Sequence, residues 1–118
     1  MQNLSPVTTH VLWKAGTITK NASALSQKID LRGIAQGGTF SLYHKHTGGT
    51  IKIEYLTAQT SSATAIAPTA STAIVSSAAT TVEDLVSFSP ELTPFIQIKV
   101  TELNVANVTS IDLSLNTQ

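Results

Sequence analysis

Apolar and polar side chains alternate almost without interruption over residues 95–103 and 107–115, which read FIQIKVTEL and NVTSIDLSL. Successive side chains of a β-strand point to opposite faces of the sheet, so a period of two predicts two strands, each with one buried face. An amphipathic helix would need an apolar period of about 3.6 residues, which neither run shows. The alternation therefore restricts the C-terminal part of the chain to a sheet that is packed on one side.

The two runs align as a hairpin that turns at residues 105–106. In this register Lys99 lies opposite Asp112, which gives an opposite-charge pair on the polar face. A slip of one residue would set Ile98 against Asp112 or Ser114, so the hydrophobic pattern specifies the register. We therefore predict a core hairpin in which six large apolar residues are buried. The facing pairs are Ile96–Leu115, Ile98–Leu113 and Val100–Ile111.

A glycine pair at residues 48–49 separates two further alternating runs, residues 39–46 and 50–57. Tight hairpin turns need positive φ angles, which glycine adopts readily, so the pair predicts a second hairpin. This register sets Lys45 opposite Lys52, a mildly repulsive pair. A three-residue turn would avoid that pair but would place a leucine against a glutamate. The expected inner face carries Phe40, Leu42, Ile51, Ile53 and Tyr55.

The remaining chain is rich in Thr, Ser, Val and Ile and is interrupted by Gly and Pro, and no part of it has the pattern of a long helix. The expected strands cover residues 10–15, 25–31, 39–46, 50–57, 82–88, 95–103 and 107–115, with one or two weaker strands between 63 and 78. Seven to nine short strands separated by turns predict an all-β, antiparallel β-sandwich or jelly roll. The length of 118 residues corresponds to a single domain, residues 1–118.

The segment of residues 57–81 differs from the rest, because 20 of its 25 residues are Ser, Thr or Ala and none is charged. Such a segment buries little surface per residue, so it is either a long mobile loop or a flat surface that a partner orders. An uncharged, β-prone edge favours aggregation in a free protein and suits a packed assembly. The candidate interface residues are Ala65, Ile66, Ala73 and Ile74 in this segment and Trp13, which also suits a core position.

The charges of the chain narrow the classes of partner. Seven basic residues balance seven acidic ones, and charged residues make up only 12% of the chain. Binding to duplex DNA or to an anionic membrane surface normally requires a basic face, so neither is expected as a partner. There is no cysteine, which excludes disulfides and thiolate ligands. We expect no secretory signal peptide and no membrane-spanning segment.

Two histidines, His44 and His46, share one face of an expected strand, with His10 or Glu54 as further metal ligands to consider. A structural or catalytic zinc site needs three or four well-placed ligands. Two imidazoles at a strand end beside a glycine turn are typical of rim residues instead. We therefore predict no bound metal and no cofactor.

Other polar residues show no catalytic pattern. Asp30 and Arg32 flank Leu31 and are expected to form a surface pair at the end of a strand. Glu83 and Asp84 are adjacent, so they point to opposite faces and do not form a cooperating carboxylate pair. The sequence has no G-x-S-x-G elbow and no phosphate-binding glycine loop, and the glycines at 37–38 are interpreted as a turn. No catalytic residue is assigned, and the protein is not expected to be an enzyme.

Three segments carry a family resemblance: SQKIDLRG, GTFSLYHKHTGGTIKIEYLTA and SFSPELTPFIQIKVTELNVANVTSIDLSLNTQ. Together they resemble small β-sandwich virion structural proteins of tailed bacteriophages, of the decoration type. The pattern of this group runs from an IDLR strand to a G-T-x-K-I-E-Y-L strand and then to an FSP…PF-x-x-IKVTE loop and strand. The match covers residues 26–57 and 87–115, and the segment between them matches no part of the pattern.

The resemblance implies a structural role in many symmetric copies, as a capsid decoration or cementing protein or as a head–tail component. The implied partners are other copies of the chain and a phage capsid or tail protein, and the implied location is the virion, after synthesis in the host bacterial cytoplasm. A carbohydrate-binding or adhesin-like β-sandwich is the alternative, although only six aromatic residues are present. An enzyme with a metal at His44, His46 and Glu54 is a third hypothesis, and it needs a further ligand.

Overall fold

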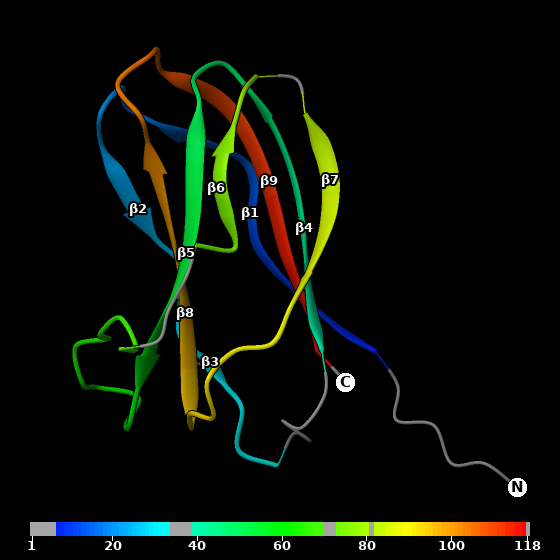
Figure 1. Cartoon of the computed structure of the whole chain (residues 1–118), viewed down its shortest axis with the longest axis vertical. Coiled ribbons are helices and arrows are strands. Elements are labelled where there is room, and N and C mark those ends of the chain that lie inside the picture. The colour runs from blue at the N-terminus through cyan, green and yellow to red at the C-terminus, as the bar shows by residue number, and fades with distance from the viewer. Residues whose placement is uncertain (1–6, 34–38, 70–72, 81, 118) are drawn as a thin grey trace, which may run out of the picture.

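The computed structural model describes residues 7–33, 39–69, 73–80 and 82–117. These residues form nine β-strands and no helix, and the strands make two antiparallel sheets that face each other (Figure 1). The all-β sandwich predicted from the alternation is therefore confirmed. The strands are β1 (Thr8–Ile18), β2 (Ser23–Leu25), β3 (Ile29–Asp30), β4 (Phe40–Thr47), β5 (Ile51–Ala58), β6 (Val75–Ala78), β7 (Glu83–Phe88), β8 (Phe95–Glu102) and β9 (Val108–Thr117).

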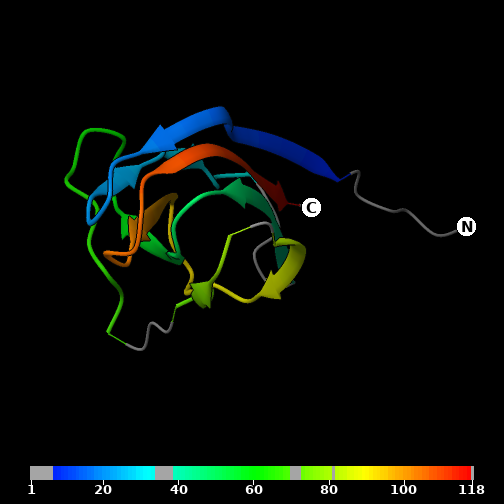
Figure 2. The same cartoon turned by 90° about the horizontal axis from the view of Figure 1, so that it is seen from above.

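Sheet A has the strand order β1-β9-β4-β7, and sheet B has the order β2-β8-β5-β6, with β3 also paired to β8. Figure 1 shows sheet B on the left and sheet A on the right. Seen from above in Figure 2, β6 and β7 lie on one side of the sandwich, and β1 lies on the opposite side. The edge strands β6 of sheet B and β7 of sheet A therefore lie on the same side of the sandwich. Within the described ranges, no helix is long and apolar enough to cross a bilayer.

The buried positions of β8 and β9 follow the alternation in the sequence. All six residues predicted for the core are 0% exposed: Ile96, Ile98, Val100, Ile111, Leu113 and Leu115. The five residues expected on the inner face of the other two runs are buried as well: Phe40, Leu42, Ile51, Ile53 and Tyr55. The period of two therefore assigned the buried side of these four strands correctly.

The predicted C-terminal hairpin is wrong, because β8 and β9 belong to different sheets. β8 pairs with β5 in sheet B, and β9 pairs with β4 in sheet A. The connection between them is an arch that crosses from one sheet to the other. Lys99 and Asp112 consequently lie on opposite outer faces, where Lys99 is opposite Glu54 and Asp112 is opposite Lys45. A hairpin and an arch bury the same side of both strands, so the alternation does not distinguish them.

The second predicted hairpin is an arch for the same reason. Its two strands, β4 and β5, lie in sheet A and sheet B, so Lys45 and Lys52 are not neighbours. The expected positive φ angles are present, at 81° for Gly48 and 71° for Gly49. The two arches lie against each other, because a Cβ atom added to Gly48 would be only 2.4 Å from the carbonyl oxygen of Asn107. The stacked arches supply the central strands of both sheets.

The single strand expected over residues 25–31 is interrupted. β2 and β3 both pair with β8, and the chain between them bulges at Ser26, whose hydroxyl accepts a hydrogen bond from the Ile98 amide at 2.9 Å. The Gln97 side chain donates to the Ser26 carbonyl at 2.6 Å. Side chains of Ser26 and Gln97 therefore replace part of the regular backbone ladder.

Part of the Ser/Thr/Ala segment is attached to sheet B. Thr57 and Ile66 exchange two backbone hydrogen bonds at 2.7 and 2.8 Å, and the Lys28 ammonium donates to the Ser61 carbonyl at 3.0 Å and to the Ala63 carbonyl. Further along, β6 is the weak strand expected between residues 63 and 78, and it pairs with β5. Residues 70–72 and 81 of this segment, like the glycines at 37–38, lie outside the described residues.

Candidate interaction surfaces and buried polar groups

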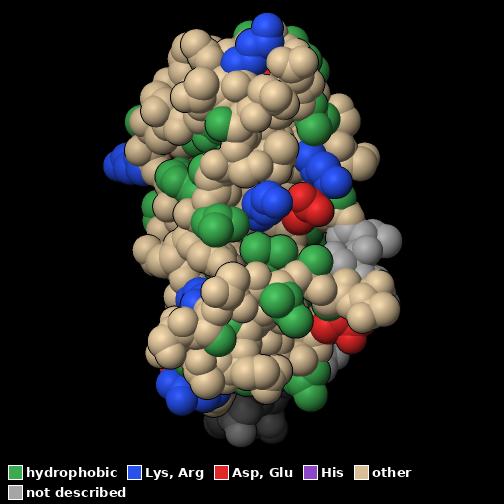
Figure 3. Space-filling view, turned by 90° about the vertical axis from the view of Figure 1, so that its left-hand side faces the viewer, with side chains coloured by type: hydrophobic (Ala, Val, Ile, Leu, Met, Phe, Trp, Pro, Cys, Tyr) green, Lys and Arg blue, Asp and Glu red, His purple; other side chains and the backbone are tan. Residues whose placement is uncertain are grey.

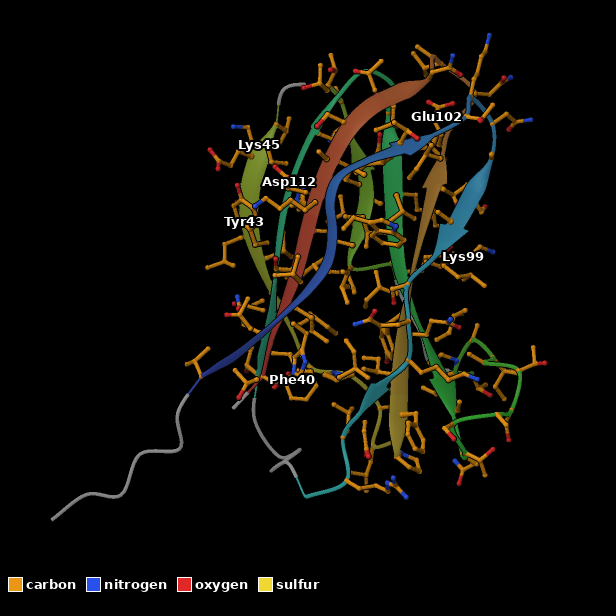
Figure 4. The ribbon with its side chains drawn as sticks, turned by 180° about the vertical axis from the view of Figure 1, so that it is seen from behind. Phe40, Tyr43, Lys45, Lys99, Glu102 and Asp112 are labelled. Atoms are coloured by element: carbon orange, nitrogen blue, oxygen red, sulfur yellow. The ribbon has the colours of Figure 1, made fainter. Side chains whose placement is uncertain are left out.

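A buried carboxylate holds three loops together at one end of the sandwich. Glu102 is 0% exposed and accepts hydrogen bonds from the backbone amides of Asn21, Thr50, Val105 and Ala106 (Figure 4). Burial alone would raise the pKa of Glu102, but the four amides outweigh it and lower the pKa to about 2. The sequence pattern alone did not indicate this role, although residue 102 continues the inward positions of β8.

His44 and His46 lie on the inner face of β4 and are each only 1% exposed, so the prediction that they are rim residues is wrong. Both occupy the alternate positions that Phe40 and Leu42 begin, and the alternation continues to the end of the strand. The Nδ1 atom of each ring is buried without a hydrogen-bond partner among the described residues. Two imidazole nitrogens without a partner among the described residues therefore lie on the inner face of β4, next to the apolar positions of Phe40 and Leu42.

The surroundings of the two imidazoles favour their neutral forms. Burial lowers the pKa of His44, the nearby charge of Asp84 on β7 acts in the opposite direction, and His46 lowers the pKa further. Burial also lowers the pKa of His46, against smaller contributions from the backbone of Gly49 and Ala78. The Nε2 atom of His46 lies 3.3 Å from the Gly49 carbonyl oxygen.

We expect the folded protein to lose stability as the pH falls from 7 to 5. In this window the unfolded chain takes up protons on both histidines, whose ordinary pKa is 6.5, while the folded chain resists their protonation. Chemical denaturation at pH 7, 6 and 5 measures the loss. The double variant His44→Gln/His46→Gln should show a flatter profile. A parental profile that is flat between pH 7 and 5 contradicts this account.

The additional metal ligands considered from the sequence are not near the two histidines. His10 lies on β1, where its Nε2 atom is 3.1 Å from the Thr117 hydroxyl. Glu54 is on β5 and forms an ion pair with Lys52 at 3.6 Å. Within the described ranges, no group of three His, Asp or Glu side chains is arranged to hold a metal ion. That this protein binds no metal stays a prediction, which elemental analysis can test.

Two adjacent hollows open between the edge strands β6 and β7. The first has a volume of about 360 Å³ and is lined by His44, Val75 and Asp84, among others. The second has a volume of about 300 Å³ and is lined by Tyr55 and Phe88, among others. Ile74 lines both hollows, so they lie next to each other along this side of the sandwich, and the two together are called the groove below.

The five residues predicted for an interface do not form one surface. Ala73 and Ile74 line the groove between β6 and β7, and Ile66 is 66% exposed beside the end of β5, where Ala65 is half-buried. Trp13 is half-buried on β1, across from Leu113, and packs against the core. This contact fits the core alternative for Trp13, and because the residue is only partly buried its interface role also stays a prediction. The other four positions stay interface predictions.

The remaining polar pairs lie as expected. Arg32 donates to Asp30 at 2.8 Å on the surface, which lowers the pKa of Asp30 to about 2, and its guanidinium lies 4.9 Å from the centre of the Phe95 ring. Glu83 lies opposite Lys45, while Asp84 lies opposite His44, so these two carboxylates point to opposite faces of β7.

The outer face of sheet A carries two rows of residues that cross all four strands. The charged row consists of Asp112, Lys45 and Glu83, in the order β9, β4, β7, and the exposed Lys14 continues it on β1, in the irregular stretch across from Asp112. The mixed row consists of Val11, Ser114, Tyr43 and Leu85, in the same strand order. Figure 4 shows Tyr43, Lys45 and Asp112 together on this face. The sequence alone predicts neither row, because both depend on the order of the strands in the sheet.

The outer face of sheet B has a different character. Its central charges are Lys99 and Glu54, which are cross-strand neighbours, and Lys52, which is ion-paired to Glu54. Figure 3 shows that uncharged polar side chains and backbone cover most of this side, with hydrophobic and charged side chains scattered among them. A face of this kind has few charges to desolvate when another protein covers it.

No family model matches the sequence, and no curated protein matches it. The fold is similar to that of a chain in a solved structure, "Structure of infectious bursal disease virus Gx strain", with a TM-score of 0.52 and 10% sequence identity. The match covers 95% of this chain and 32% of the viral chain, so this chain spans about a third of the length of its structural neighbour. At this identity the likeness establishes the fold.

Proposed function

We propose that this protein is a non-enzymatic structural component of a virus particle, and more narrowly a capsid decoration, cementing or head–tail protein of a tailed bacteriophage. Its work is binding: it contacts other copies of itself and a capsid or tail protein of the particle. The observation that carries the proposal is the β-sandwich itself, which covers 95% of this chain in its match to a chain of a virus structure.

The surface composition supports protein partners over nucleic acid or membrane. The net charge is zero, and the outer faces present mostly hydroxyl, amide and small apolar groups. Exposed hydrophobic side chains are spread over the surface, including Val11, Ile66, Leu85 and Leu92, which are each more than half exposed. Such surfaces are covered at low desolvation cost when copies assemble. Assembly in the virion would follow synthesis in the host bacterial cytoplasm.

The placement of the ionisable groups supports a role without catalysis. Glu102 is hydrogen-bonded to four backbone amides, and Asp30 is held by Arg32. The two buried histidines lie on the inner face of β4, and Asp84 at the rim of the groove accepts a hydrogen bond from the amide of Leu85 at 2.8 Å. Glu102 and Asp30 are thus held in structural contacts. His44 and Asp84 line the same hollow, but no hydrogen bond joins them as an acid–base pair.

The carbohydrate-binding alternative needs exposed aromatic rings. Among the described residues, Phe40, Tyr55 and Phe95 are buried, and Phe88 contacts both Phe40 and Tyr55. Tyr43 is half-buried on the outer face of sheet A. This distribution favours a protein-binding surface over a sugar-binding platform.

The proposal is tested by light scattering coupled to gel filtration, together with co-sedimentation with the capsid or tail protein encoded beside this one. We expect assembly, co-sedimentation or both. Ile66→Glu should weaken co-sedimentation, because it buries an unpaired charge in the predicted interface. Leu92→Glu, at a residue that is 81% exposed outside that segment, is the matched control. A monomer that binds neither itself nor these proteins contradicts the structural role, and glycan binding by that monomer would favour the alternative.

A further inference from the structure

The two edges of sheet A carry opposite charges. Lys14 on β1 and Glu83 on β7 are both exposed. Among the described residues, ion pairs join only Arg32 to Asp30 and Lys52 to Glu54. Neither Lys14 nor Glu83 takes part in these ion pairs, although Glu83 accepts a hydrogen bond from the Tyr43 hydroxyl, so both charges can pair with charges outside the chain.

The sign of the charge alternates along the charged row. The amide of Ala15, next to Lys14, donates to the Asp112 carboxylate at 2.7 Å, so residues 14–15 lie across from Asp112, between the pairs Trp13–Leu113 and Gly16–Ile111. Lys45 is the cross-strand neighbour of both Asp112 and Glu83. The row thus reads positive, negative, positive, negative from β1 to β7. If the alternation continued beyond Glu83, the next side chain would be positively charged. Lys14 at the β1 edge of a second copy would supply that charge.

The mixed row places an exposed apolar residue at each edge of sheet A. It begins at Val11, which is 57% exposed on β1, and ends at Leu85, which is 58% exposed on β7. Leu85 lies two positions from Glu83 on β7, and Val11 lies three positions from Lys14 on β1. The additional residue on β1 is accommodated by a bulge. A contact that sets Glu83 beside a second copy's Lys14 therefore also sets Leu85 beside its Val11.

The strand directions allow this contact. Each neighbouring pair in sheet A is antiparallel, so β7 runs opposite to β1. When β7 of one copy lies beside β1 of the next, the two strands are antiparallel, as are all neighbours within the sheet. Asp84 already accepts a hydrogen bond from the Leu85 amide, so side chains, rather than a continued backbone ladder, make the contact.

We propose that β7 of one copy binds against β1 of a second copy, with Glu83 beside Lys14 and Leu85 beside Val11. This inference rests on the proposed function, which requires contacts between copies. The contact joins two different surfaces, so its repetition generates a ring or an open row of subunits, in contrast to a two-fold dimer.

Charge reversal tests the contact. Glu83→Lys and Lys14→Glu should each raise the dissociation constant of the assembly about tenfold or more, measured by light scattering at low salt. An equimolar mixture of the two variants should assemble again. In a row that alternates the two variants, the introduced lysine meets the introduced glutamate at every second junction, and the unchanged Glu83 and Lys14 meet at the others. Weakening by each single reversal together with recovery on mixing is specific to a contact between β7 and β1, since a β7–β7 contact would not be weakened by the change at residue 14.

Glu91→Lys and Lys20→Glu are the matched controls, because they make the same charge changes at exposed residues outside the strands of sheet A. They should leave the dissociation constant within about threefold of the parent. Circular dichroism checks that each variant folds. Lys14→Glu changes an exposed side chain with no hydrogen bond to lose, so it keeps the test valid if Glu83→Lys unfolds when its bond from the Tyr43 hydroxyl is lost.

The outcomes separate the two proposals. Assembly of the parent that neither reversal weakens overturns the edge contact and leaves the proposed function standing. Weakening without recovery in the mixture also overturns the pairing of these two edges. A parent that stays monomeric overturns the edge contact, and it overturns the proposed function as well if that monomer binds no capsid or tail protein.

Discussion

Replacing Ile98 with alanine is expected to lower the free energy of unfolding by about 2–4 kcal/mol. Ile98 is 0% exposed at the centre of β8, where its strand is flanked by β5 and by the Ser26 bulge that follows β2. Truncation removes apolar contacts with both sheets and leaves a cavity. The cavity cannot close, because β8 is paired with neighbouring chain on both of its edges. Denaturation in urea at neutral pH measures the change.

Leu92→Ala is the control for this variant, because Leu92 is 81% exposed. Its loss should stay below about 0.5 kcal/mol. A loss of that small size for Ile98→Ala would mean that the inward face of β8 does not form the core, and the sandwich described above would be wrong at its centre.

Replacing Gly48 with alanine is expected to cost about 3 kcal/mol or more, or to prevent folding. The residue has a φ angle of 81°, and a Cβ atom would lie 2.4 Å from the Asn107 carbonyl oxygen in the neighbouring arch. The positive φ angle alone costs about 1 kcal/mol for alanine, and the backbone contact adds to it, because the two arches must separate.

Gly33→Ala isolates these two contributions. Gly33 has a similar φ angle of 84°, but a Cβ atom there meets nothing within 4 Å. This variant should lose only about 1 kcal/mol. Equal losses for the two variants would contradict the stacking of the arches, whereas a much larger loss at Gly48 would support it. Thermal unfolding of both variants in one buffer makes the comparison.

The alternation of the sequence was sufficient to predict the class of the fold and the buried side of its central strands. All the residues expected in the core from β8 and β9 are fully buried, and the positive φ angles at Gly48 and Gly49 were expected from the residue type. These properties are local, since they depend on which way successive side chains point and on which residues tolerate a given φ angle.

The alternation was not sufficient to predict the partners of these strands. Both glycine- and asparagine-containing connections were interpreted as hairpins, and both are arches between sheets. The inner faces of the two sheets pack against each other. A residue such as Leu113 is therefore buried whether its strand forms a hairpin or an arch with the preceding strand. Strand pairing depends on how all the strands pack together in the sandwich. It therefore cannot be predicted from the pattern of neighbouring residues in the sequence.

The candidate sites divide in the same way. The inward position of Glu102 was readable from the alternation of β8, and so was that of His44 and His46, although a strand end beside two glycines suggested the rim instead. The pairing of Lys14, Asp112, Lys45 and Glu83 in one row was not readable, because these residues come from four strands far apart in the chain.

By itself, then, the sequence determined an all-β chain, the buried face of each central strand and the places where the backbone turns, because these follow from local geometry and from the period of the hydrophobic residues. Only the tertiary structure decided that consecutive strands cross between sheets, that a lone buried carboxylate is stabilised by four amides, and that the edges of sheet A carry opposite charges. Those features require groups that are distant in the chain to meet, and the free energy of the whole packed sandwich selects which of them do.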